Sequence, residues 1–115
     1  MKDRNTSIIE KILEYINEIE GTVSRFQLDF ESFKSDYVVK NAISMSLLQI
    51  GELAGKLTDD FKNEHNFVPW RDITALRNRV AHTYGSIDLE ILWGIAENDI
   101  PKLKKYCENI IKETS

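Results

Sequence analysis

Three side chains that can do chemistry fall within eight residues of this chain, in the segment RNRVAHTY at positions 77–84. The guanidinium group of Arg77 can bind a phosphate through two parallel hydrogen bonds and stays charged at any ordinary pH. The imidazole of His82 exchanges protons near neutral pH, which suits a general acid or base. The hydroxyl of Tyr84 adds a third polar group. The segment is therefore a candidate site for phosphate binding combined with proton transfer.

The residues around this segment predict that it closes one helix, from about Trp70 to Thr83. Pro69 suits a helix start, and Gly85 suits a helix end. On such a helix Arg77 and His82 lie about 140° apart around the axis and about 7.5 Å apart along it. Both side chains can then reach one phosphate-sized object, although not as an in-line pair.

A simpler interpretation is that Arg77 and His82 only solvate the polar face of the helix and cap its C-terminal end. Two details favour a functional role. Ala75 and Asn78, the neighbours of His82 on its face, are small or polar and leave room for a ligand. Tyr84 follows at the helix end, where its hydroxyl can project.

Composition predicts one domain, residues 1–115, of the all-α class. The chain has 115 residues, 42% of them hydrophobic, with only five glycines, two prolines and no long strand-like alternation. It contains no long apolar run and no signal-peptide pattern, so we expect a cytoplasmic protein without membrane contact. The net charge of −4 argues against a general nucleic-acid-coating role. It still allows a local cationic cluster (Arg71, Arg77 and Arg79) and leaves acidic surface for a basic protein partner.

The apolar periodicity predicts an all-α bundle of four to five helices, with Leu76 and Val80 buried in its core. The first helix is expected from Thr6 to Glu20, capped by Thr6 or Ser7 and ended or bent by Gly21. The remaining expected elements are a short helix capped by Asp29, a long helix over Asp36–Leu57, a polar connector over Thr58–Val68, the Trp70–Thr83 helix, a helix around Leu89–Ala96 capped by Ser86 or Asp88, and a last helix that starts or kinks at Asp99 and Pro101.

Two glycines, Gly51 and Gly55, lie four residues apart in the long helix, where they lower helix propensity. We expect another helix to approach closely there, and the helix that carries Arg77 is a candidate. Glu52, between the glycines, is either a solvated carboxylate in a weak surface ion pair or an acid that orients Arg77 or Arg71. A metal-ligand role is disfavoured, because no partner at ligand spacing shares its face.

The single cysteine and the second histidine have ordinary interpretations. Cys107 lies on the apolar side of the last helix, which indicates a core residue rather than a nucleophile. His65 lies in the polar connector and is expected to be solvated.

Four ordered blocks of this sequence resemble the HepT-like toxin family, which are HEPN-fold ribonucleases of toxin–antitoxin modules. The match covers nearly the whole chain and is weakest before about Asp29. One block is the R-x4-H-x-Y motif of Arg77, His82 and Tyr84, which is third in chain order. The others are QIGELA at 49–54, VPWRDI at 68–73, and IDLEILW at 87–93 leading to DIPKL at 99–103.

The resemblance implies a HEPN-type helical bundle with its active site at a homodimer interface. It further implies an endoribonuclease that needs no metal and no cofactor. Arg77 and His82 would be catalytic, supported by Asn78, Glu52 and Arg71. RNA, either mRNA or tRNA, would be the substrate, and its 2′-hydroxyl would attack the adjacent phosphate.

The resemblance also implies an antitoxin partner, a minimal nucleotidyltransferase (MNT), in a type VII-like module. That partner would transfer AMP to Tyr84 and so silence the toxin. Two alternatives remain at this stage. One is a non-catalytic helical subunit that binds nucleotide or presents substrate in a nucleotidyltransferase complex, and the other is a structural dimerisation module. The intact motif of Arg77 and His82, together with Tyr84, disfavours both.

Overall fold

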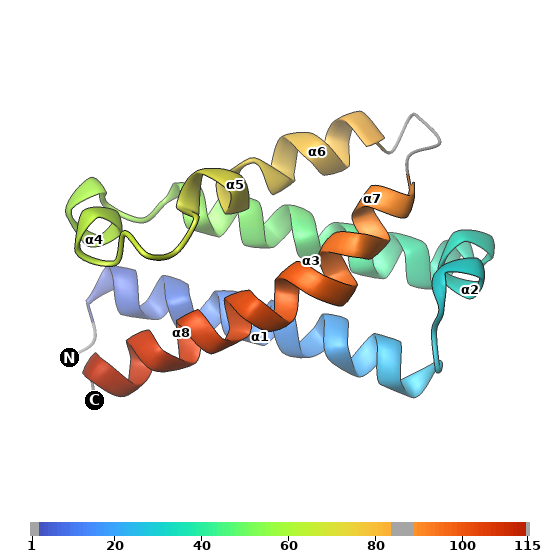
Figure 1. The fold of residues 1–115 in the computed structure, drawn as a ribbon, viewed down its shortest axis with the longest axis horizontal. Helices are drawn as coiled ribbons and strands as arrows, with labels where there is room; N and C mark the ends of the chain where they lie inside the picture. Colours follow the sequence, from blue (N-terminus) through green and yellow to red (C-terminus); the bar gives the residue numbers. More distant parts are fainter. Residues whose placement is uncertain (1–2, 84–88, 115) are drawn as a thin grey trace.

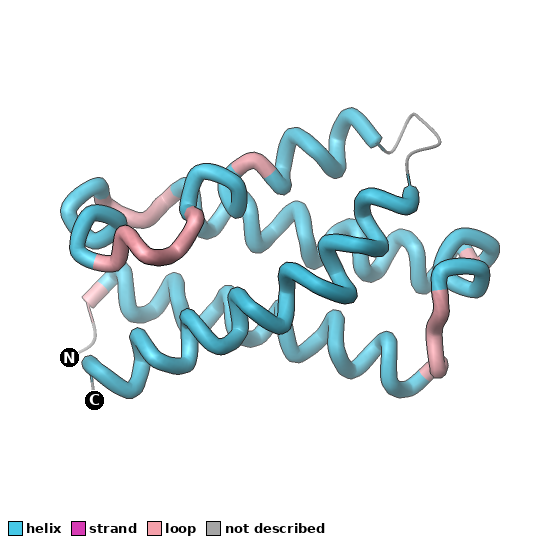
Figure 2. Tube along the Cα trace, in the orientation of Figure 1, coloured by secondary structure: helices cyan, strands magenta, loops and turns pink. Residues whose placement is uncertain are grey.

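The computed structural model describes residues 3–83 and 89–114, with the side chains of residues 82 and 83 outside that description. Throughout this part of the chain helices follow one another through short turns, and it contains no strand (Figure 2). This confirms the all-α class. The elements are α1 Arg4–Arg25, α2 Phe30–Ser35, α3 Tyr37–Gly55, α4 Asp59–Glu64, α5 Trp70–Thr74, α6 Leu76–Thr83, α7 Leu89–Gly94, the π-helical η1 Ile95–Asp99, and α8 Ile100–Thr114.

The bundle consists mainly of α1, α3, the α5–α6 pair and the α7–η1–α8 stretch (Figure 1). α3 packs against α1 on one side and against α5 and α6 on the other, while α8 crosses α1. α7, η1 and α8 form one continuous rod, and the short helices α2 and α4 lie at opposite ends of the molecule. The described residues thus form more helical segments than the predicted four to five. The short helices α2 and α4 are separate, the motif helix is divided into α5 and α6, and a π-helical turn, η1, lies between α7 and α8.

The core forms where the apolar stripe of α1 meets α3 and α8. Burial of each large aliphatic side chain contributes roughly 1.5–3 kcal/mol relative to exposure. Leu76 and Val80 belong to the same cluster, which confirms their predicted burial. Among the described residues no helix is both long enough and apolar enough to cross a membrane. The fully buried residues of α1 are Ile9, Ile12, Ile16 and Ile19.

The predicted limits of the first helix were too narrow at both ends. Asp3, not Thr6 or Ser7, is the N-cap, and its Oδ1 accepts a hydrogen bond from the Thr6 backbone N–H at 2.7 Å. The helix then continues through Gly21 to Arg25. A mid-helix glycine costs only about 1 kcal/mol, which the packing of a further turn can offset.

The segment 58–68, predicted as a polar connector, contains the helix α4. Thr58 caps it by accepting a hydrogen bond from the Phe61 backbone N–H at 3.2 Å. The interpretation of His65 as solvated was wrong: it is only 7% exposed, and its ring centroid lies 4.5 Å from that of Phe61. Phe61, His65 and Val68 follow i, i+4, i+7 spacing, a short buried face diluted among polar residues.

The helix that carries the motif is interrupted once. It begins at Trp70 as predicted and runs to Thr83, but Ala75 separates α5 from α6. The predicted start or kink near Asp99 and Pro101 corresponds to the change from η1 to α8, where the Ile100 N–H bonds to the Ile95 carbonyl five residues back. The predicted caps Ser86 and Asp88 lie outside the described residues.

The predicted close approach at the glycine pair is confirmed at Gly51. A Cβ atom there would lie 2.6 Å from the backbone nitrogen of Arg77 and 3.3 Å from the Ile73 carbonyl oxygen. At Gly55 the nearest atom would be Thr74 Cγ2, at an ordinary 3.6 Å. The hydrogen side chain of Gly51 therefore lets α3 pack directly on the backbone of the helix that carries Arg77.

Candidate active site

The side chain of Arg77 is held from the neighbouring helix. Its Nε forms an ion pair with Oε1 of Glu52 on α3, and Nη1 lies 3.5 Å from the side-chain oxygen of Asn78. The Arg77 side chain is nevertheless 58% exposed. The guanidinium group is thus oriented on one edge and open to solvent on the others.

Two adjacent residues of α3 set this arrangement. Gly51 brings the Arg77 backbone against α3, and Glu52, the next residue, contacts the Arg77 side chain. Both contacts join neighbouring residues of α3 to the same residue of α6. The position of the guanidinium therefore depends on how closely α3 and α6 pack, as well as on the ion pair.

A shallow hollow of about 330 Å³ surrounds this contact. Sequence reasoning placed Glu52, Arg77 and Asn78 in one site, and all three line the hollow. Lys56, which also lines it, was not predicted, although it lies one turn after Glu52 on α3, a spacing that brings two side chains together. The hollow therefore presents two cations, Lys56 and Arg77. Gly51, Gly55 and Thr74 complete its lining.

Three other predicted site residues have different positions. Arg71 is exposed on α5 and does not line the hollow. His82 lies in the last turn of α6, five residues after Arg77. Tyr84 lies outside the described residues.

An exposed apolar strip continues from this site along α3. Val38 is 58% exposed and Met45 is 56% exposed. They are seven residues apart, and Glu52 follows seven residues later, so all three share one helix face. The ion pair therefore lies in line with uncovered apolar surface.

Cys107 has no part in this site. It is fully buried in α8, and burial, with a smaller contribution from Glu108, raises the pKa of its thiol to about 12. A thiol with so high a pKa is a poor nucleophile. Its interpretation as a core residue is confirmed.

Comparison with known proteins gives consistent matches over most of the chain. The family model described as ribonuclease HepT-like matches residues 12–110. The protein named "Probable ribonuclease HepT" from Thermococcus cleftensis is 33% identical over 97% of this chain and 100% of its own length. "Putative RNase MJ1380" from Methanocaldococcus jannaschii is 36% identical over 84% of this chain and 87% of its own. No solved structure has a significant match to the chain.

Proposed function

Because this chain belongs to the ribonuclease HepT-like family, we propose that it is an endoribonuclease that cleaves RNA without a metal ion. One observation carries the proposal furthest: the guanidinium group of Arg77 is fixed by Glu52 yet remains largely open to solvent. A fixed, accessible cation beside a second cation, Lys56, suits a phosphate of an RNA strand.

In the proposed reaction the RNA supplies its own nucleophile. The 2′-hydroxyl oxygen attacks the adjacent phosphorus while His82 accepts its proton, a step typically worth ~10²–10⁴-fold in rate. Arg77 binds the non-bridging oxygens and stabilises the charge that develops on them. The bond to the 5′-oxygen breaks, and that oxygen leaves with a proton donated by His82 of the partner subunit. The products are a 2′,3′-cyclic phosphate and a 5′-hydroxyl.

The remaining site residues position this pair. Glu52 orients Arg77, and Asn78 contacts the guanidinium group or the RNA. Arg71, outside the hollow, contacts the RNA backbone further along the strand.

We further propose that the active enzyme is a homodimer. A single imidazole serves only one of the two proton transfers well, and a second copy would supply another His82. The apolar strip of Val38 and Met45 is the surface we assign to that contact, since it shares a face with Glu52. Closure of a second copy over this face would also exclude water from the ion pair and strengthen its electrostatics.

Cleavage of a defined RNA by the purified protein tests the reaction. Arg77→Ala and His82→Ala should each lower the rate by about 100-fold or more. Arg25→Ala, which removes an exposed arginine at the far end of α1, is the matched control and should cleave normally. Activity should persist in EDTA, and one 2′-deoxynucleotide at the cut site should block it. A metal requirement would refute this mechanism, and nucleotide binding without cleavage would favour the subunit of a nucleotidyltransferase complex.

Met45→Glu tests the dimer. The side chain is exposed, so the fold should tolerate the change, but a charge in an apolar contact should shift the protein to monomer in sedimentation experiments. Cleavage should fall with the loss of dimer. Lys105→Glu, an exposed change on α8, is the control. A fully active monomer would refute the shared site.

The proposed control uses Tyr84 and a nucleotidyltransferase antitoxin. The tyrosine oxygen attacks the α-phosphorus of ATP, pyrophosphate leaves, and the attached AMP then competes with RNA phosphate for Arg77. Tyr84→Phe should remain active and escape inactivation by antitoxin and ATP. If mass spectrometry finds no AMP on the wild-type protein, inhibition must come from binding alone.

A further inference from the structure

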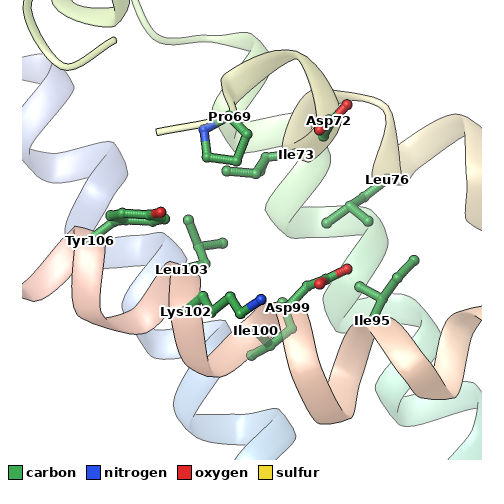
Figure 3. Close-up of a pocket in the computed structure, with 10 residues that line it drawn as sticks. All are labelled: Pro69, Asp72, Ile73, Leu76, Ile95, Asp99, Ile100, Lys102, Leu103 and Tyr106. Atoms are coloured by element: carbon green, nitrogen blue, oxygen red, sulfur yellow. The ribbon is translucent and has the colours of Figure 1, made fainter. Parts of the chain in front are cut away.

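A second groove lies between the helix that carries Arg77 and the η1–α8 rod (Figure 3). It has a volume of about 330 Å³ and runs between α5–α6 and the η1–α8 rod. Leu76 faces this groove while Asn78 faces the candidate active site, and the two residues lie about 160° apart around α6. The cleavage mechanism makes no use of the groove.

The floor of the groove is aliphatic, and its rim is acidic. Ile73 and Leu103 are buried and face each other from α5 and α8. Asp72 on one wall and Asp99 on the other are both exposed, and neither has an ion pair or hydrogen bond within the described part of the chain. Lys102 also lines the groove, and among the described residues it forms no salt bridge with either carboxylate. The lining thus has two carboxylates that are unpaired within the described residues and one ammonium group, a net charge of about −1.

One end of the groove is aromatic. Tyr106 lines it, and the centroid of its ring is 5.8 Å from that of Phe67, which is half exposed. Asp99 ends η1, and single π-helical turns within α-helices frequently occur at functional sites. The groove therefore combines an apolar floor, an aromatic end and an acidic rim.

We propose that this groove docks a protein partner through an arginine that stands next to a large aliphatic residue. The guanidinium group would lie between Asp72 and Asp99, and the aliphatic side chain would cover Ile73 and Leu103 toward Tyr106. The charge complementarity argues for a cationic group, and the buried floor argues for an apolar one beside it. A partner segment supplies both at once, whereas a free polyamine has no side chain for the floor. The acidic chain as a whole favours a basic partner in the same way.

This docking site goes beyond RNA cleavage, and an experiment can refute it while the cleavage function holds. The probe is acetyl-leucyl-arginine amide, titrated into the ¹⁵N-labelled protein and followed by amide chemical shifts. We expect shifts that saturate and that map to α5, η1 and the first turns of α8. The citrulline analogue, which has the same shape and no charge, should bind about three- to ten-fold more weakly. Argininamide, which lacks the leucine, should also bind more weakly.

Two isosteric variants locate the contact. Asp72→Asn and Asp99→Asn should each weaken binding of the leucyl-arginine probe about three- to five-fold, as expected for exposed ion pairs. Glu18→Gln, an exposed carboxylate of α1, should change nothing. All three variants should cleave RNA at the wild-type rate, which separates this proposal from the catalytic one. Shifts that map elsewhere, equal binding of the citrulline probe, or equal binding of argininamide would overturn the docking site.

Discussion

Replacement of Gly51 by alanine tests whether close helix packing positions Arg77. The added Cβ would lie 2.6 Å from the Arg77 backbone nitrogen, so α3 and α6 must separate by about 0.8 Å to restore an ordinary contact of 3.4 Å. Overpacking of this kind costs typically 1–3 kcal/mol, while the gain in helix propensity returns about 1 kcal/mol. We expect a net loss of up to about 2 kcal/mol, which lowers Tm by up to roughly 8 °C.

Gly55→Ala is the matched control, because its Cβ meets only Thr74 Cγ2 at 3.6 Å. It should raise stability by about 0.5–1 kcal/mol, since alanine restricts the unfolded chain. Urea unfolding of both variants measures the difference, and RNA cleavage reports the displacement of Arg77. Gly51→Ala should lower cleavage under conditions where it is fully folded, whereas Gly55→Ala should not. If Gly51→Ala is as stable as Gly55→Ala, backbone contact at Gly51 does not set the distance between these helices.

Three further outcomes follow from particular contacts. Glu52→Gln should lower the free energy of unfolding by less than about 1 kcal/mol, because its ion pair is partly exposed. The rate of RNA cleavage should nevertheless fall, because Glu52 orients Arg77. An unchanged rate would show that Glu52 has no such role. The Ser32 backbone N–H and hydroxyl lower the pKa of Asp29, so its contribution to stability is complete above pH 3.8 and is lost as the pH falls through the lower folded value. Asp29→Asn should therefore show a shallower loss of stability between pH 5 and 2 in denaturant titrations, and parallel curves would contradict this. Cys107, buried and with a pKa of about 12, should resist a thiol reagent at pH 8 until guanidinium unfolds the chain; rapid labelling of the native protein would show that α8 opens.

The parts of the fold that sequence predicted were those with an uninterrupted apolar stripe. Four isoleucines at three- and four-residue steps identified α1, and Leu76 with Val80 identified the buried side of α6. The connector was misjudged because its buried face has only three residues, Phe61, His65 and Val68, and polar neighbours outnumber them. A histidine in such a setting gives no sequence signal of burial, since burial comes from packing with Phe61.

The candidate site was predicted less completely, for a different reason. Spacing along one helix relates Arg77 to Asn78, but it says nothing about which residues of α3 lie opposite them. That register is set by the backbone contact at Gly51, and it brings Lys56 into the hollow while Arg71 remains outside. Family resemblance supplied Glu52, where periodicity alone left its role open.

The ion pair at Arg77 also divides a single guanidinium group between two anions. Glu52 takes the Nε side, and the group has five N–H donors in a planar fork, so both terminal nitrogens can still face a phosphate. An ammonium ion has no separate edges: it would have to share one point of charge between the carboxylate and the substrate. Lysine at position 77 would therefore preserve the charge of this site but not its ability to be anchored and available at the same time.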